Sequence, residues 1–280
     1  MVQSEANIKK FSIEVMPKTA QKISDFTRIL PPKTLVYVAH LEDTDISDMR
    51  YTCKRLIDEN MIPIPHIPAR IIQGPEELEK WASKYAEIGV KRSLLLAGNN
   101  KSPKGSFHSS IQLLETGVFE KYGYEYINVA GHPEGNPDID KAGFLTDTLS
   151  ALKIKNEYSK TTNIKIGITT QFCFDLEPVK IWLKMLEKEN INLPVNLGVA
   201  GPTKLQTLIK YALICGVGSS ISVIKKRAKD ITKLLVPFEP TEIIKQISEK
   251  SFAEEFKNVH SLHFFPLGGI EASASFAQRF

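Results

Sequence analysis

The chain has 280 residues, of which 42% are hydrophobic and 24% are charged. These proportions are typical of a soluble globular protein and exclude an intrinsically disordered one. The formal net charge of +4 is too small to indicate a nucleic-acid-binding protein of this length, although it favours small anionic ligands.

The first residues, MVQSEANIKKFSIEVMPK, contain no apolar segment of the length that a secretory signal needs. No later segment approaches the ~20 uninterrupted apolar residues of a membrane helix. We therefore expect a cytoplasmic protein with no membrane partner.

The cysteines Cys53, Cys173 and Cys215 are odd in number, widely separated and without C-x-x-C spacing. We expect reduced core thiols, because this pattern supports neither a disulfide framework nor a bound metal. The most basic run, KKRAK from Lys225 to Lys229, is interpreted either as a solvated helix face or as a patch that attracts phosphates.

Short β-rich apolar runs recur along the chain, and each is followed by a segment with helical periodicity. The eight expected strands are Phe11–Val15, Leu35–Ala39, Ile62–Ile67, Ser93–Gly98, Tyr126–Gly131, Ile164–Cys173, Leu193–Val199 and His260–Leu267. The expected helices are Asp45–Glu59, Glu76–Ile88, Ser109–Leu114, Lys141–Lys153, Pro178–Glu189 and Thr203–Cys215. Further helices are expected between 216 and 249, where the pattern does not define their ends.

The expected strands are nearly continuous in apolar character, which is typical of parallel strands buried on both faces. Eight strand–helix units in this length predict a single (β/α)8 TIM barrel over residues 1–280, with a doubly wound open sheet as the alternative. Polar residues follow or end several strands, including Glu14, His66, Asn99 and Gln171. Because a barrel gathers its strand ends at one rim, they predict a small-molecule pocket there.

Four motifs occur along the chain in this order: FSIEVMPK from Phe11, PHI from Pro65, GHPEGNPD from Gly131 and TTQFCFD from Thr169. Together they resemble the signatures of the methylenetetrahydrofolate reductase family, and the resemblance covers most of the chain. The C-terminal third, with LHFFPLGG in place of the last strand, is similar to the family more loosely.

The resemblance implies a TIM-barrel oxidoreductase of one-carbon metabolism, which interconverts 5,10-methylenetetrahydrofolate and 5-methyltetrahydrofolate. In this family NAD(P)H supplies hydride through bound FAD, so the family is one of flavoproteins. Glu14 matches the general acid, which is needed because opening the methylene bridge requires a proton on a folate nitrogen. The alternative for Glu14 is a carboxylate that pairs with a basic neighbour.

The same resemblance implies that Gln171 hydrogen-bonds the pterin ring and that Glu134 and Phe172 contribute to binding tetrahydrofolate derivatives. An amide suits the donor and acceptor edge of a pterin, although Gln171 could equally cap a strand end. Asn99 stands where the family has a catalytic aspartate near both rings, and a neutral amide there keeps hydrogen bonding without the charge.

The implied cofactor-binding residues are His66, Gly98, Asn99, His108, His132, Asn136 and Lys160. Several depart from the family pattern, since histidines replace aromatic residues and Asn136 replaces a histidine. Ala39 and His40 replace a threonine and an aromatic residue after the second strand.

Three interpretations follow: a reductase with FAD and an altered contact set, a flavin-free member that passes hydride directly from NAD(P)H to folate, and a folate-binding one-carbon transferase or non-catalytic subunit. The sequence does not distinguish NADH from NADPH, because it has no G-x-G-x-x-G unit. A barrel of this size is also compatible with a homo-oligomer.

Overall fold

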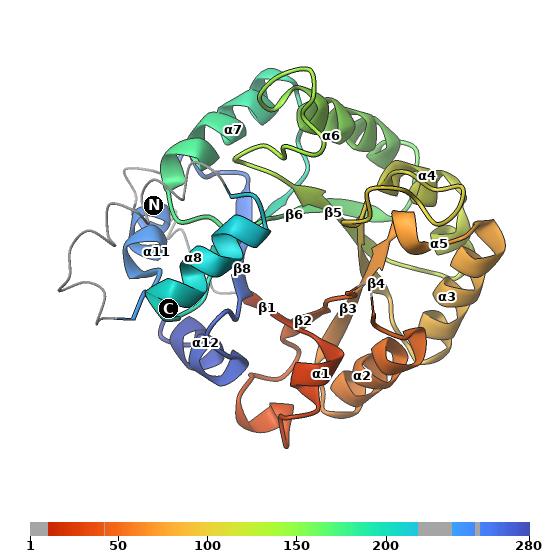
Figure 1. The fold of residues 1–280 in the computed structure, drawn as a ribbon, viewed down its shortest axis with the longest axis horizontal. Helices are drawn as coiled ribbons and strands as arrows, with labels where there is room; N and C mark the ends of the chain where they lie inside the picture. Colours follow the sequence, from red (N-terminus) through yellow and green to blue (C-terminus); the bar gives the residue numbers. More distant parts are fainter. Residues whose placement is uncertain (1–10, 42, 218–236, 250–252) are drawn as a thin grey trace, which may run out of the picture. The chain divides into compact units, whose positions relative to one another are not determined.

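Eight parallel strands form a closed barrel in the chain order β1 to β8, with helices between them (Figure 1). The computed structural model describes residues 11–41, 43–217, 237–249 and 253–280. The fold is therefore the expected (β/α)8 TIM barrel, and closure excludes the open doubly wound sheet. The basic run Lys225 to Lys229 lies outside the described residues.

The observed strands agree with the expected ones to within three residues at each end. They are β1 Phe11–Val15, β2 Leu35–Val38, β3 Ile62–Pro68, β4 Arg92–Leu96, β5 Tyr126–Gly131, β6 Lys165–Thr170, β7 Val195–Ala200 and β8 Val259–Phe265. The helices are α1 Pro17–Ala20, α2 Ile46–Asp58, α3 Pro75–Glu87, α4 Ser110–Glu115, α5 Val118–Lys121, α6 Thr146–Ser159, α7 Leu176–Lys188, α8 Leu205–Ile214, α11 Thr241–Ser248 and α12 Ile270–Ala277. Two 3-10 turns, η1 Phe26–Arg28 and η2 Ala69–Ile71, complete the described elements.

One expected helix begins in the wrong place, because α6 starts at Thr146 and not at Lys141. The carboxylate of Asp140 accepts hydrogen bonds from the backbone N–H groups of Asp147 and Thr148 at 3.0 and 2.8 Å. These donors belong to the first turn of α6, where backbone N–H groups have no partner within the helix. The preceding residues form turns, and Leu145 adopts a positive φ of 60°, which ends any helical path through them.

The chain divides into two compact units. The N-terminal unit comprises Glu14–Ala130 and Ile154–Ile168, and the C-terminal unit comprises Met1–Ile13, Gly131–Lys153 and Thr169–Phe280. In the part of the chain that the structure describes, no helix combines the length and the apolar character needed to cross a membrane.

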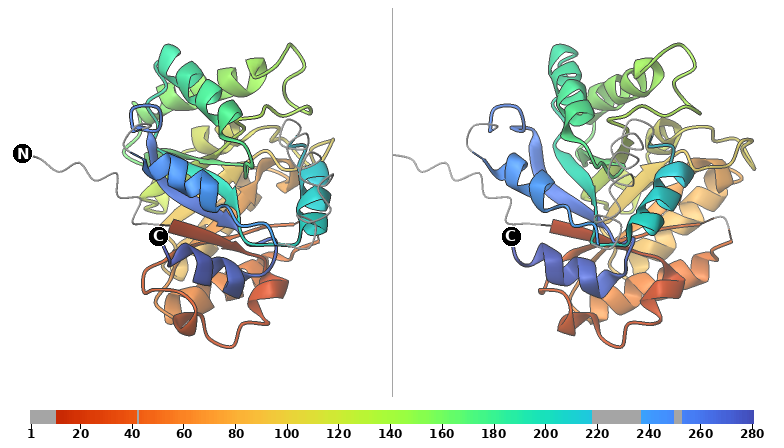
Figure 2. Two further views of the ribbon diagram at one scale, coloured as in Figure 1. Left: turned by 90° about the vertical axis from the view of Figure 1, so that its left-hand side faces the viewer. Right: turned by 60° about the vertical axis from the view of Figure 1, so that its left-hand side comes forward.

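In the N-terminal unit, α2 and α3 lie side by side next to the strands β2 and β3 (Figure 2). Both helices start as their sequences predict, α2 with Asp45 accepting from the Ser47 N–H at 2.7 Å and α3 with Pro75 in its first turn. Each buries one face, which includes Met49 and Leu56 on α2 and Leu78 on α3. This packing fixes the strands whose ends carry the candidate residues.

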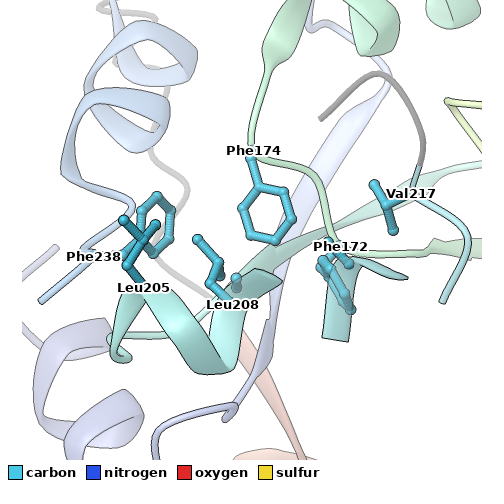
Figure 3. Close-up of a cluster of buried hydrophobic side chains, with 8 residues drawn as sticks. Phe172, Phe174, Leu205, Leu208, Val217 and Phe238 are labelled. Atoms are coloured by element: carbon cyan, nitrogen blue, oxygen red, sulfur yellow. The ribbon is translucent and has the colours of Figure 1, made fainter. Parts of the chain in front are cut away.

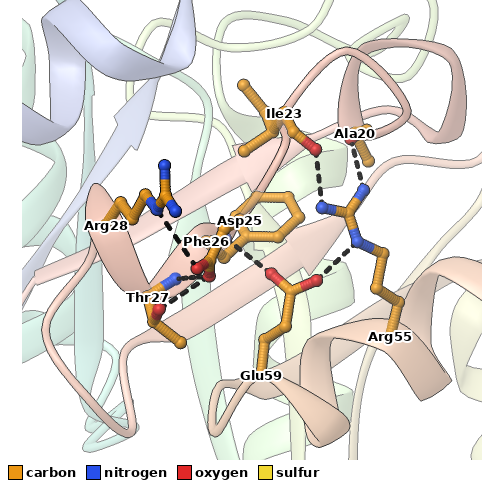
Figure 4. Close-up of polar contacts among 8 residues, drawn as sticks. All are labelled: Ala20, Ile23, Asp25, Phe26, Thr27, Arg28, Arg55 and Glu59. Atoms are coloured by element: carbon orange, nitrogen blue, oxygen red, sulfur yellow. Dashed lines mark hydrogen bonds and ion pairs between the residues drawn. The ribbon is translucent and has the colours of Figure 1, made fainter.

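Arg55 of α2 connects the segment after α1 to the barrel (Figure 4). Its guanidinium donates to the carbonyl oxygens of Ala20 and Ile23 at 2.9 and 2.6 Å and to the Glu59 carboxylate at 2.6 Å. Glu59 in turn accepts from the Phe26 N–H at 2.5 Å, and the guanidinium also lies 5.1 Å from the centre of the Phe26 ring. The contacts are charge-assisted and partly buried, and such hydrogen bonds are among the stronger ones in proteins.

The C-terminal unit contains an apolar cluster that includes Phe172, Phe174, Leu205, Leu208 and Phe238 (Figure 3). The aromatic rings of this cluster meet edge to face or at a tilt, with centroids 5.2 to 5.7 Å apart. The cluster packs α8 against the residues that follow β6. It therefore holds the backbone at the carboxyl end of β6 in place.

Strands β6, β7 and β8 also carry a row of polar side chains. The Ser261 hydroxyl donates to the side-chain oxygen of Asn196 at 2.6 Å, and the Asn196 amide donates to the Thr169 hydroxyl at 3.3 Å. Ser261 and Thr169 are buried, so the row satisfies polar groups that have left water. It passes across three neighbouring strands through direct side-chain contacts.

Candidate functional site

Glu14 and His66 meet at the carboxyl ends of β1 and β3 in the N-terminal unit. The His66 Nε2 atom lies 3.3 Å from the Glu14 Oε2 atom, and the two side chains are only 12% and 18% exposed, respectively. The contact is not a hydrogen bond, since the buried Nε2 atom has no hydrogen-bond partner among the described residues. The Tyr37 ring meets the His66 ring edge to face with centroids 6.1 Å apart.

His40 follows β2 and stacks on Trp81 of α3, with ring centroids 5.1 Å apart and planes inclined by 18°. Its buried Nδ1 atom makes no hydrogen bond within the described ranges. Burial is the largest cause that lowers the pKa of His40 to about 4; the nearby His66 and, to a smaller extent, Lys104 act in the same direction, while Asp45 opposes the shift. His40 is therefore a neutral imidazole at physiological pH.

The loop after β4 carries Gly98 and Asn99. Gly98 adopts a φ of +92°, and a Cβ atom there would lie 3.1 Å from the Cβ of Pro68, so this position favours glycine. Arg70 holds the loop by donating to the carbonyl oxygens of His108 at 3.0 Å and Asn100 at 3.2 Å. Asn99 itself is exposed at the carboxyl end of the strand.

His108 is also exposed, and the contacts that fix it are made by its backbone. Its N–H donates to the Gln112 side chain at 2.6 Å and its carbonyl oxygen accepts from Arg70. The structure therefore leaves the His108 imidazole at the surface of the loop.

The structure places Lys160 away from the other implied cofactor residues of its unit. It follows the last residue of α6 and precedes Lys165, where β6 begins, so it lies at the amino end of the strands. Its ammonium contacts both carboxylate oxygens of Glu157 at 2.7 and 2.9 Å, and both side chains are exposed. Lys160 was assigned because a lysine of the family occurs at about this position in the sequence. Position in the sequence does not show at which end of the strands the residue lies.

In the C-terminal unit, the turn after β5 and the end of β6 line a small cleft of about 10 Å³. His132, Glu134 and Gln171 contribute its polar groups, and the cysteines Cys173 and Cys215 also line it. The Gln171 Oε1 atom accepts from the Phe172 N–H at 3.0 Å. This contact is the strand-end cap that sequence reasoning kept as the alternative, and the side-chain NH2 group of Gln171 is a donor suited to a ligand in the cleft.

Two implied contacts have structural roles in the same unit. The Phe172 ring is only 2% exposed and packs against Phe174 and Phe265 with centroids 5.2 and 5.3 Å apart. The Asn136 Oδ1 atom accepts from the Asp138 N–H at 2.9 Å, and its backbone N–H donates to Asp140 at 2.8 Å. Phe172 therefore contributes mainly to the core, and Asn136 stabilises the turn.

Lys160, the cation that the resemblance implies for the FAD diphosphate, does not lie with the other implied cofactor residues of the N-terminal unit. A diphosphate is bound by cations or by aligned backbone N–H groups. Lys160 lies at the opposite end of its strands, and the guanidinium of Arg70 is engaged with two carbonyl oxygens.

The fold and the polar groups at the strand ends define a (β/α)8-barrel protein with a candidate small-molecule site. No model of a known protein family matches the chain. Among solved structures, the chain is similar to 7,8-dihydropteroate synthase from Vibrio fischeri ES114, with 8% identity over 98% of this chain and 92% of that one and a TM-score of 0.46.

Two other solved structures show similarity of the same degree. The carboxyl transferase domain of Rhizobium etli pyruvate carboxylase is 8% identical over 92% of this chain and 40% of that one, with a TM-score of 0.47. N-acetylneuraminate lyase from Fusobacterium nucleatum is 13% identical over 89% and 78%, with a TM-score of 0.43. Likeness this distant carries no argument about function.

Sequence reasoning missed the stacking of His40 on Trp81 and the role of Arg70. The first pair is separated by 41 positions in the chain, and no local pattern connects the two residues. The buried Nδ1 atom of His40 becomes evident only from the packing. Arg70 lies in the 3-10 turn η2 that follows β3, and the sequence shows it only as a cation near the end of that strand.

Proposed function

We propose that the protein is an oxidoreductase of the methylenetetrahydrofolate reductase type, which interconverts 5,10-methylenetetrahydrofolate and 5-methyltetrahydrofolate with NAD(P)H as the hydride source. The observation that supports this proposal is the position of Glu14. Its carboxyl group lies at the carboxyl end of β1, largely shielded from water and 3.3 Å from a histidine nitrogen. Such surroundings suit a group that must hold and release a proton.

The proposed reaction needs a proton and a hydride at different atoms. Glu14 donates a proton to a folate nitrogen, the methylene bridge opens to an iminium ion, and hydride adds to the iminium carbon. In the reverse direction the carboxylate of Glu14 accepts the proton. The resemblance assigns the pterin ring to Gln171 and Glu134, an amide and a carboxylate that suit its donor and acceptor edge.

A flavin-free form of this reaction, with direct hydride transfer from NAD(P)H, is favoured by one observation. Lys160, the implied partner of the flavin diphosphate, pairs with Glu157 at the amino end of the strands. A colourless protein that oxidises NAD(P)H with methylenetetrahydrofolate supports direct transfer. A yellow protein whose colour is bleached by NAD(P)H supports a flavoprotein, and a colourless protein that binds folate but is inert toward NAD(P)H supports a transferase or a binding subunit.

The role of Glu14 is tested by Glu14→Gln, which keeps the size of the side chain and removes its acid. We expect turnover to fall roughly 100-fold or more with little change in folate affinity, because the lost interaction belongs to the transition state. Glu87→Gln is the matched control, since Glu87 is 61% exposed on α3. A Glu14→Gln enzyme with near-normal turnover would remove Glu14 from the acid role.

A further inference from the structure

A cavity of about 120 Å³ lies in the C-terminal unit, between the start of α7 and the start of α11. It is much larger than the cleft beside Gln171, which has about 10 Å³, and it has room for several water-sized groups. The lining residues whose chemistry defines this cavity are Phe174, Asp175, Phe238, Glu239 and Glu242. The proposed reaction uses none of them, and the cavity is therefore a separate candidate for ligand binding.

The charges on the wall of this cavity are negative. Among the described lining residues, three carry carboxylates and none carries a positive charge. Two of the carboxylates have basic partners outside the lining, since Glu239 lies 3.7 Å from Arg279 and Glu242 lies 3.2 Å from Lys245. All four side chains are at least 40% exposed, and exposed ion pairs of this kind contribute little free energy. A cation inside the cavity can therefore replace these partners at small cost.

The carboxylates are too dispersed for a single metal ion. In the ranges that the structure describes, no group of three or more His, Cys, Asp or Glu side chains is arranged to hold one. A cation such as Mg²⁺ or Ca²⁺ needs several oxygen ligands that converge on one point. Separated carboxylates suit instead an organic cation whose charges are also separated.

Two aromatic rings supply the apolar part of the wall. Phe174 and Phe238 meet edge to face with ring centroids 5.7 Å apart (Figure 3). The face of an aromatic ring attracts an ammonium group, and the ring also packs well against methylene groups. Carboxylates next to aromatic rings therefore suit an alkylammonium ion.

A buried hydroxyl group lies beside one of these rings. Thr203 and Phe238 form an antiparallel bridge and exchange both backbone hydrogen bonds, at 3.0 and 2.8 Å. Residues directly opposite each other in such a pair carry their side chains on one face, so the Thr203 hydroxyl is on the same side as the Phe238 ring, which borders the cavity. Thr203 is only 5% exposed, and its Oγ1 atom has no hydrogen-bond partner among the described residues. Such an atom costs free energy unless a bound group satisfies it.

We propose that this cavity binds a small α,ω-diamine in its doubly protonated form. The two ammonium groups contact the three carboxylates of the wall, and the methylene chain packs on the two aromatic rings. The Thr203 hydroxyl accepts a hydrogen bond from one ammonium group. The inference does not depend on the proposed reaction, because no residue proposed for folate binding takes part.

The probe is 1,4-diaminobutane, titrated into the intact protein by isothermal calorimetry at low ionic strength. We expect saturable binding that weakens as salt is added, because the attraction is partly electrostatic. Butylamine has the same carbon chain and one charge fewer, and we expect it to bind about tenfold more weakly. Absence of saturable binding at millimolar diamine, or equal affinity for the two amines, overturns the proposal. Displacement of the diamine by Mg²⁺ that binds more tightly shows an inorganic-cation site and also overturns it.

Substitutions locate the site on the protein. Glu242→Gln removes one carboxylate and keeps the size of the side chain, so we expect the dissociation constant of the diamine to rise about fivefold. Thr203→Val keeps the shape of the side chain, and loss of its hydrogen bond should raise the constant by a similar factor. Glu177→Gln on α7 is the matched control, because Glu177 and Glu242 are both 71% exposed and Glu177 does not line the cavity. An equal loss of affinity in Glu177→Gln, or no loss in the two test variants, overturns the site.

Discussion

His40 and Trp81 form a stacked pair across the β2 end and α3, with ring planes only 18° apart. The indole covers one face of the imidazole and leaves the buried Nδ1 atom without a hydrogen bond among the described residues. A protonated ring would carry a charge into this setting, which is why the neutral form is favoured.

This pair makes folding stability depend on pH. The pKa of His40 falls from 6.5 to about 4 on folding because of burial and the nearby His66. Between these values the unfolded chain binds a proton that the folded chain does not, so the free energy of unfolding decreases as pH falls from 6.5 toward 4. After allowance for partial solvent contact of the ring, we expect His40 to contribute about 1–2 kcal/mol to this loss.

The measurement is urea unfolding of wild type and His40→Phe across that pH range. Phenylalanine keeps an aromatic ring on Trp81 and cannot be protonated, so its stability should vary less with pH. His260→Gln serves as a control for an exposed histidine. Parallel pH curves for wild type and His40→Phe would contradict the assignment.

Arg55→Ala should destabilise the protein by about 2–3 kcal/mol, because the change leaves the Glu59 carboxylate and two carbonyl oxygens without their charged donor. Guanidinium chloride unfolding measures the loss. Lys54→Ala on the same helix removes an exposed ion pair with Asp58, and its effect should stay below about 1 kcal/mol. Equal effects of the two substitutions would show that Arg55 does not hold the segment after α1.

Gly105→Ala should disturb the loop that carries Asn99. A Cβ atom at Gly105 would lie 1.9 Å from the Gln73 carbonyl oxygen, so the backbone must shift. We expect a loss of about 2 kcal/mol or more in the free energy of unfolding. Gly74→Ala is the matched control because its Cβ would meet nothing nearer than 3.9 Å, and a Gly105→Ala protein as stable as this control would refute the close approach.

Asn99→Asp tests whether a negative charge at the end of β4 assists the proposed reaction. Because Asn99 is exposed, folding stability should change by less than about 0.5 kcal/mol. A carboxylate beside bound substrate would favour the cationic iminium ion, so turnover with methylenetetrahydrofolate should rise severalfold. Asn99→Ala removes the amide without adding charge, and equal turnover in the two variants would show that this charge plays no part.

The three thiols should differ in reactivity toward a disulfide reagent. Cys53 and Cys173 are buried, and burial raises the pKa of both thiols, whereas Cys215 is only half-buried. We expect one thiol to react quickly in the native protein and the other two after denaturation, because the thiolate is the reacting form. Fast reaction of more than one native thiol would contradict the packing around Cys53 or Cys173.

The strand positions were predictable because their signal is local. A continuous apolar run such as YINVAG predicts a buried parallel strand without knowledge of its neighbours, and β5 has the expected ends. The end of β4 came two residues early, because the backbone leaves the strand before Gly98, whose positive φ is not a strand conformation. The helix α12 was missed, since its small residues give a weak helical pattern.

The sequence predicts the position of a candidate site residue only where that residue lies within a strand. Glu14 and His66 lie within β1 and β3, whose positions the apolar pattern predicts. Lys160 and Asn136 lie outside strands, and their contacts with Glu157 and Asp138 depend on turn geometry that the sequence motif does not determine. His40 stacks on Trp81 because of the way α3 packs, and the spacing of residues in the sequence does not predict that packing.

The polar row of Ser261, Asn196 and Thr169 favours one register among the strands β6, β7 and β8. A slip of one residue between two strands sends every side chain to the opposite face. Moving β7 in this way would part Asn196 from both partners and leave buried polar groups unsatisfied, each at a cost of about 1–3 kcal/mol. Apolar side chains alone would allow several registers between these strands, whereas the hydrogen bonds of the polar row form in only one register.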